Sequence, residues 1–185
     1  CSSFSKNQKH KGGITVAKSI LDGKWILAVD DEPDVLEVLG SEILGACPNC
    51  KLDKATSYQT AVEKLGSQNY DLVILDIMGV RGFDLLEVVV RQDVPAAMLT
   101  AHAFNPEYLK RSFEMKARTY LPKEKLGDIV PFLEDILEEN EYLSGWGRTM
   151  KRLESFFDKR WGEDWRKSDP KFWKDFDRKT ARTKT

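Results

Sequence analysis

Short, continuous apolar runs alternate along the chain with longer stretches in which apolar residues recur at helical spacing. Such runs are typical of strands buried on both faces of a parallel sheet, and the stretches between them are typical of amphipathic helices. The alternation predicts an α/β fold, in which a doubly wound, five-stranded parallel sheet carries helices on both faces. The strands are expected at residues 25–29, 51–55, 72–75, 96–100 and 119–121, and the helices at residues 33–43, 57–65, 83–89, 106–113 and 126–137.

The pattern divides the chain into three segments. Residues 1–22 are polar at first and then hold a short apolar patch from Ile14 to Leu21, so we expect a flexible leader with at most one short element. Residues 23–140 contain the alternating pattern and are expected to form the α/β domain. Residues 141–185 hold four of the five tryptophans and are expected to form a helical, tryptophan-rich tail.

The tail continues the apolar period of the fifth predicted helix. We therefore expect that helix to extend into the tail, with a break or kink at Gly145 and Gly147 and a second short helix starting at Pro170. An apolar stripe of this size must be covered, and its cover can be the chain's own domain, a second copy, another protein or, because basic and aromatic residues interleave, nucleic acid. The stripe consists of Leu143, Trp146, Met150, Leu153, Phe157 and Trp161.

Composition and charge exclude some classes of protein. The net charge is only −1, but a basic tail follows an acidic body. No apolar run approaches the roughly 18 residues that a membrane span needs, so a cytoplasmic protein without membrane contact is expected. Cys47 and Cys50 have the spacing of a redox or zinc pair, yet they fall between a helix and a strand with no second pair, and we interpret them as incidental residues of a turn.

Polar side chains gather where the predicted strands end. Asp30 and Asp31 follow the first strand, Asp76 ends the third, Thr100 ends the fourth, and Lys123 follows the fifth. Ligands of open parallel sheets bind at this edge. Carboxylates held together repel unless a cation joins them, and Mg²⁺ suits such oxygen ligands. A carboxylate beside Mg²⁺ can attack phosphorus while an ammonium and a hydroxyl hold the phosphoryl oxygens.

These residues resemble a known family in their order and context. The Asp-Asp pair, Leu-Asp-Ile-Met around Asp76, Met-Leu-Thr-Ala at Thr100 and Tyr-Leu-Pro-Lys ending at Lys123 are similar to the chemotaxis-type receiver domain of bacterial two-component response regulators. The resemblance covers residues 23–140 and implies the flavodoxin-like receiver fold.

The resemblance also implies a role for each site residue. Asp76 would be the phosphoacceptor. Lys123 and Thr100 would bind the phosphoryl group, and Tyr120 would be the switch aromatic that changes rotamer as Thr100 moves. The Mg²⁺ ligands would be Asp30, Asp31, Asp76 and the backbone carbonyl of Met78.

The implied function is a switch that receives its phosphoryl group from a histidine kinase or phosphotransfer protein. Its enzymatic activity would be limited to self-catalysed phosphotransfer and autodephosphorylation. Output would pass through protein contacts of the tail or of the face formed by the fourth helix, fifth strand and fifth helix, with a homodimer or another protein as partner. Two alternatives stay open: a nucleic-acid-binding regulator that uses the basic aromatic tail, and a haloacid-dehalogenase-type hydrolase, because Asp30 and Glu32 have that family's two-residue spacing.

Two features depart from the family pattern. Val80 and Asp84 stand where the family usually has Pro and Gly, and Gly82 comes two residues early, so the loop after Asp76 is short and the start of the third helix is in doubt. Glu124 follows Lys123 where Pro is usual, so no cis bond is expected there.

Overall fold

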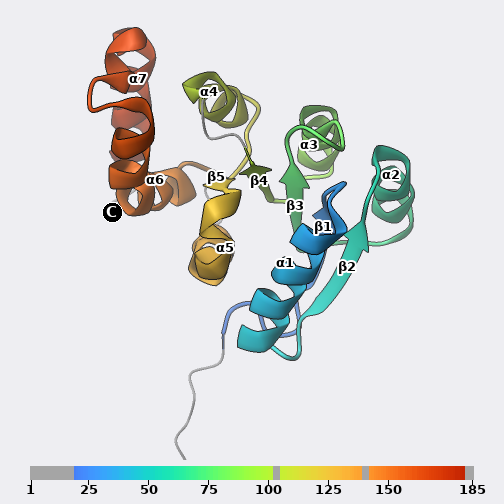
Figure 1. Cartoon of the computed structure of the whole chain (residues 1–185). Helices are drawn as coiled ribbons and strands as arrows, with labels where there is room; N and C mark the ends of the chain where they lie inside the picture. Colours follow the sequence, from blue (N-terminus) through green and yellow to red (C-terminus); the bar gives the residue numbers. More distant parts are fainter. Residues whose placement is uncertain (1–18, 102–104, 139–141, 182–185) are drawn as a thin grey trace, which may run out of the picture.

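All five predicted strands are present in the computed structural model, which describes residues 19–101, 105–138 and 142–181 (Figure 1). Every neighbouring pair is parallel, and the strand order is β2-β1-β3-β4-β5. The expected parallel sheet is therefore confirmed, with β5 at one edge. The strands are β1 (Trp25–Val29), β2 (Lys51–Ala55), β3 (Leu72–Asp76), β4 (Ala96–Thr100) and β5 (Thr119–Pro122).

Helices cover both faces of the sheet, as the doubly wound pattern predicts. Helices α1 and α5 lie on one face, and α2, α3 and α4 lie on the other (Figure 1). The hydroxyl of Ser57 caps α2 by accepting the N–H of Thr60. The last predicted helix begins as a 3₁₀ turn, η1. The helices are α1 (Pro33–Ala46), α2 (Tyr58–Ser67), α3 (Gly82–Arg91), α4 (Pro106–Glu114), η1 (Lys123–Asp128) and α5 (Ile129–Glu138).

The packed part of the fold begins before residue 23. Leu21 is completely buried, and the thiol of Cys50 donates a hydrogen bond to its carbonyl at 2.9 Å. The hydroxyl of Ser19 also bonds to Glu134 on α5 at 2.6 Å. Residues 19–22 thus pack on the domain, and most of the expected leader, residues 1–18, lies outside the described residues.

The tail does not continue α5, so that prediction is wrong. It forms α6 (Tyr142–Trp161), η2 (Trp165–Ser168) and α7 (Pro170–Ala181). Asp135 on α5 pairs with Arg148 and Arg152 on α6, each at 3.0 Å. In one continuous helix those residues would be roughly 20 Å or more apart. Helix α6 therefore folds back along α5.

The two glycines of α6 do not interrupt it, which corrects the expected kink. The helix runs through Gly145 and Gly147 without a break. A Cβ at Gly145 would lie 3.0 Å from the carbonyl oxygen of Arg118, so this glycine permits close approach to the α/β domain. Pro170 does begin a separate helix, as predicted.

The apolar stripe of the tail packs on the chain's own domain. The Trp146 indole N–H donates to the carbonyl of Ala117 at 2.7 Å, just before β5. Phe113 of α4 contacts Trp146 and Phe176, with ring centroids 5.4 and 4.7 Å apart. Figure 1 shows α6 beside β5 and α7 beyond α4. The tail therefore covers the face formed by α4, β5 and α5.

The cysteine pair occupies a turn between α1 and β2, as predicted. Both thiols are free and buried. Burial, and next the neighbouring Cys47, raises the pKa of the Cys50 thiol to about 12. A thiol with so high a pKa is a poor nucleophile and a poor metal ligand at neutral pH.

Within the described residues, no helix combines the length and the apolar character needed to cross a membrane.

Candidate functional site

The carboxyl ends of the strands bring the predicted side chains Asp30, Asp76 and Lys123 together. Register pairs Val29 of β1 with Leu75 of β3, so the next residues, Asp30 and Asp76, lie level with each other. Both carboxyl groups are buried, because the strands that carry them lie inside the sheet. Lys123 follows β5 and reaches across to both.

Lys123 is the centre of this cluster. Its Nζ lies 2.7 Å from Oδ2 of Asp30, 3.0 Å from Oδ1 of Asp76 and 2.9 Å from Oε1 of Glu32. The lysine side chain is only 11% exposed, so its ion pairs with the buried Asp30 and Asp76 are shielded from water and strengthened by the low local dielectric, whereas Glu32 is exposed. One ammonium thus balances part of the charge of three carboxylates.

Burial and ion pairing have opposite effects on the pKa of each group in the cluster. Burial raises the pKa of Asp30, and the hydrogen bond from Lys123 opposes this rise. Burial alone would lower the pKa of Lys123, but the carboxylates of Asp30, Glu32 and Asp76 raise it above its usual value. Lys123 therefore stays charged over the physiological range.

Asp76 is fixed by its own loop as well as by Lys123. Its Oδ2 accepts the backbone N–H groups of Met78 at 3.1 Å and Gly79 at 2.8 Å. Two such donors stabilise the carboxylate and hold the backbone of Met78 beside it. Met78 itself is 58% exposed.

Three aspartates form a group that can hold a metal ion. Asp30, Asp31 and Asp76 each offer an oxygen, and these oxygens lie within 4.8 Å of one another. Asp31 is exposed, so a site for a hydrated cation opens to solvent on its side. An all-oxygen set with a solvent-facing edge fits Mg²⁺, which keeps several waters.

Thr100 on β4 and Tyr120 on β5 lie on the side of the cluster toward the edge strand β5. Thr100 ends β4, one residue beyond Leu99, the register partner of Asp76. Both Thr100 and Tyr120 are completely buried. The structure thus places the predicted site residues at the carboxyl ends of the strands. Tyr120 lies two residues before the end of β5, level with Met98 of β4.

Sequence reasoning missed two contributors to this site. Glu32 was considered only in the hydrolase alternative and not in the receiver site, although it pairs with Lys123. Gly79 was not considered, yet a Cβ at this position would clash with the carboxyl group of Asp31. The presence of a glycine in the short loop after Asp76 could have indicated this close packing. No cis peptide bond occurs among the described residues, as expected.

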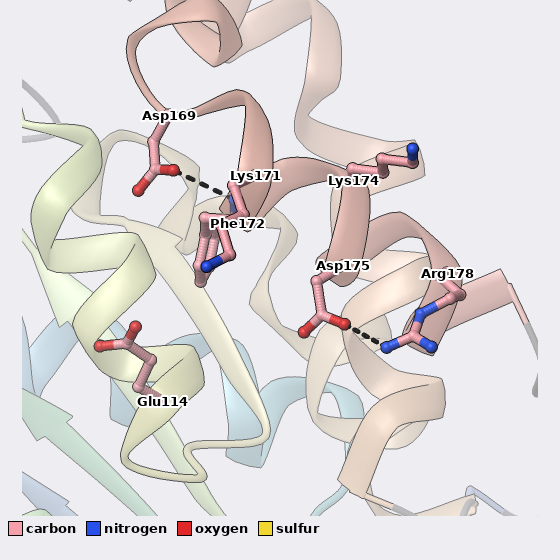
Figure 2. A pocket seen from close by; sticks show the side chains of 7 residues that line it. All are labelled: Glu114, Asp169, Lys171, Phe172, Lys174, Asp175 and Arg178. Carbon is pink, nitrogen blue, oxygen red and sulfur yellow. Dashed lines mark hydrogen bonds and ion pairs between the residues drawn. The ribbon is translucent and has the colours of Figure 1, made fainter.

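A separate hollow lies between α4 and α7, away from the strand ends (Figure 2). Glu114 of α4 faces a row of tail residues of both charge signs, of which Asp175 and Arg178 form an ion pair. This mixture of positive and negative side chains selects no ligand class, so the strand-end cluster is the candidate site. The hollow is lined by Glu114, Asp169, Lys171, Phe172, Lys174, Asp175 and Arg178.

Comparison with known proteins agrees with this geometry. The family model of the response regulator receiver domain matches residues 26–133. The sensory transduction protein LytR of Staphylococcus haemolyticus (strain JCSC1435) is 35% identical over 102 residues, which are 52% of this chain and 38% of that protein. The sensory transduction protein LytT of Bacillus subtilis (strain 168) is 28% identical over 100 residues, 53% of this chain and 41% of that protein. The chain thus matches about two-fifths of the length of these relatives.

Solved structures show the same fold over the receiver part. A putative response regulator from Chloroflexus aurantiacus J-10-fl superimposes with a TM-score of 0.57 and 26% identity, over 64% of this chain and 100% of that one. The receiver domain of NtrX from Brucella abortus gives a TM-score of 0.55 and 26% identity, over 61% and 98%. Since the family model covers more than half of the chain and the fold agrees, this chain belongs to the response regulator receiver domains of two-component signal transduction.

Proposed function

We propose that the chain is a phosphorylation-activated signalling switch in which Asp76 accepts a phosphoryl group from a histidine kinase or phosphotransfer protein. The observation that carries this proposal is the setting of Asp76. Its carboxylate lies at a strand end, is held by two backbone N–H groups and Lys123, and has Asp30 beside it.

The proposed transfer needs a nucleophile and a balance for negative charge. One carboxylate oxygen of Asp76 forms a bond to phosphorus while the phosphorus–nitrogen bond of a phosphohistidine breaks, and the electron pair of that bond stays on the imidazole nitrogen. The ammonium of Lys123, now shared among carboxylates, then pairs with phosphoryl oxygens. The hydroxyl of Thr100 donates a further hydrogen bond to the same group.

The carboxylates would hold Mg²⁺ at this site. Its ligands would be Asp30, Asp31 and Asp76, directly or through water, together with the backbone carbonyl of Met78. When bound, Mg²⁺ supplies a hard cation that offsets the repulsion among carboxylates and phosphoryl oxygens.

Output in this proposal passes through protein contacts of the tail and of the face that it covers. The tail's aromatic side chains Trp146, Phe157 and Trp173 are buried against the chain's own domain or each other. Buried rings cannot stack on bases, so these three side chains do not favour the nucleic-acid alternative. The chain's chemistry is limited to its own phosphorylation and dephosphorylation.

Intact mass spectrometry after incubation with phosphoramidate tests the proposal, because this small donor carries the same phosphorus–nitrogen bond as phosphohistidine. The wild type should gain one phosphoryl group only with Mg²⁺, and Asp76→Asn should gain none. Asp84→Asn is the matched control, since Asp84 is an exposed aspartate of the same segment that pairs with Arg81. Equal phosphorylation of Asp76→Asn and the wild type would overturn the proposal.

A further inference from the structure

Tyr120 is completely buried although it lies on an edge strand of the sheet. Its cover on the outer side comes from the tail. Phe157 of α6 contacts the Tyr120 ring with centroids 6.2 Å apart, and Phe157 is itself completely buried. The tail therefore fills the space into which an edge-strand side chain would otherwise turn.

Phe157 is in turn held by other aromatic rings of the tail. Trp161 stacks on it with ring centroids 4.5 Å apart, and Trp165 meets its edge at 5.9 Å. Trp165 packs against Trp173 of α7 at 4.6 Å. Because such interiors are close-packed, the Tyr120 ring cannot turn outward unless this aromatic cluster moves.

The inner neighbour of Tyr120 is Thr100. Tyr120 is the register partner of Met98, and side chains two residues apart on a strand share a face, so Thr100 is the diagonal neighbour of Tyr120. Burial raises the pKa of Tyr120, and the hydroxyl of Thr100 acts in the opposite direction, in keeping with a hydroxyl beside the phenol. Contacts thus run from the tail through Tyr120 to the end of β4.

The end of α6 also contacts the turn that follows Lys123. Arg160 pairs with Glu124 at 3.4 Å, and the ammonium of Lys125 lies over the ring of Phe156 at 5.7 Å. Glu124 occupies the place where the family usually has proline. The tail is therefore anchored within two residues of the site lysine as well as on Tyr120.

We propose that Phe157 is a positioning residue that keeps Tyr120 buried and thereby sets Thr100 for a phosphoryl group on Asp76. A receiver whose edge tyrosine is free to turn must order that ring when Thr100 moves toward the site, at a cost in side-chain entropy. Here the docked tail has already ordered it. Tail docking and phosphoryl binding should therefore favour each other, and this coupling is reciprocal. The inference rests on the proposed function and deepens it.

Calorimetric titration of the full chain with beryllofluoride and Mg²⁺ measures this coupling. Phe157→Leu should weaken binding of the mimic by about fivefold or more, the lower end of usual couplings between sites. Phe172→Leu is the matched control: it removes another ring of the tail, which contacts Phe113 and Trp173, and should change affinity by less than about twofold. If Phe157→Leu loses its fold, Phe157→Met takes its place, because the flexible methionine side chain fills irregular core space.

A double-mutant cycle with Tyr120→Ala separates positioning from a general structural role. If Phe157 acts through Tyr120, adding Phe157→Leu to Tyr120→Ala should not weaken binding further. An effect of Phe157→Leu that persists in that background would overturn the inference, as would unchanged or tighter binding by Phe157→Leu alone. Absence of binding by the wild type would overturn the proposed function and this inference with it, whereas equal affinities would overturn the inference alone.

Discussion

Gly82 lies directly against the backbone of Asp76, so that a Cβ at Gly82 would be 2.0 Å from the Asp76 carbonyl oxygen. The Gly82 N–H also bonds to the carbonyl of Ile77 at 3.2 Å, and the preceding residue, Arg81, adopts a left-handed conformation with φ of 56°. These contacts explain how a loop shorter than the family pattern still closes after the acceptor. Helix α3 begins at this glycine, which settles where the third helix starts.

Gly82→Ala should therefore destabilise the fold. The new methyl group would meet backbone atoms that cannot move aside, and overpacking of this kind costs about 1–3 kcal/mol or more. Gly66→Ala in α2 is the control, because a Cβ there meets nothing within 4 Å and alanine favours a helix by up to about 1 kcal/mol. Urea unfolding monitored by circular dichroism compares the two. A Gly82→Ala protein as stable as the wild type would contradict the close contact.

Asp31→Asn should weaken Mg²⁺ binding by about tenfold or more, equivalent to about 1.4 kcal/mol. This change removes one carboxylate from the three whose oxygens lie within 4.8 Å of one another. Glu32→Gln removes the same charge from the next residue, which pairs with Lys123 instead, and should have a smaller effect. Isothermal titration with MgCl₂ provides the affinities. A larger loss for Glu32→Gln than for Asp31→Asn would show that the wrong carboxylate was assigned.

Trp146→Phe should destabilise docking of the tail by about 2–3 kcal/mol, because it leaves the buried carbonyl of Ala117 without its donor and removes part of a large ring. Trp25→Phe is the same substitution at a site whose indole N–H has no hydrogen-bond partner among the described residues. Its cost should be smaller for that reason. Hydrogen exchange of α6 and thermal unfolding measure the difference, and equal costs would argue against the role of the Trp146 hydrogen bond.

Cys50 should be nearly inert toward iodoacetamide in the folded protein. Only the thiolate reacts, and burial, which raises the pKa of this thiol to about 12, keeps it protonated even at mildly alkaline pH. Peptide mapping of alkylated protein should show labelling about a hundredfold or more slower in buffer than in urea. Rapid labelling of the native chain would instead indicate an accessible thiol and reopen a redox role for the pair.

The sheet and the polar residues at the carboxyl ends of its strands could be predicted because the sequence signals for both are local. The run Leu72 to Leu75 is apolar without interruption, as a strand buried on both faces must be, and Asp76 breaks it at the place where ligands bind. The same reasoning placed Thr100 and Lys123 at the ends of their strands. Position in a parallel sheet therefore follows from sequence once the strands are recognised.

The course of the tail could not be predicted in the same way. The helical spacing of apolar residues is continuous from α5 into α6, so it does not indicate that the chain reverses direction between these helices. The reversal is visible only in long-range pairs such as Asp135 with Arg148, and a charged residue in a helix has many possible partners. The close packing of Gly82 on Asp76 likewise depends on three-dimensional contact, although the shortened loop indicated that something there was unusual.

In the proposed function, Asp76 carries the phosphoryl group. Borohydride reduces an aspartyl phosphate to homoserine, so reduction of the phosphoramidate-treated chain followed by peptide sequencing in a mass spectrometer locates the acceptor. We predict homoserine at residue 76 when Mg²⁺ is present, and the same peptide without modification in the absence of donor. Homoserine at another aspartate, with residue 76 unmodified, would contradict the account.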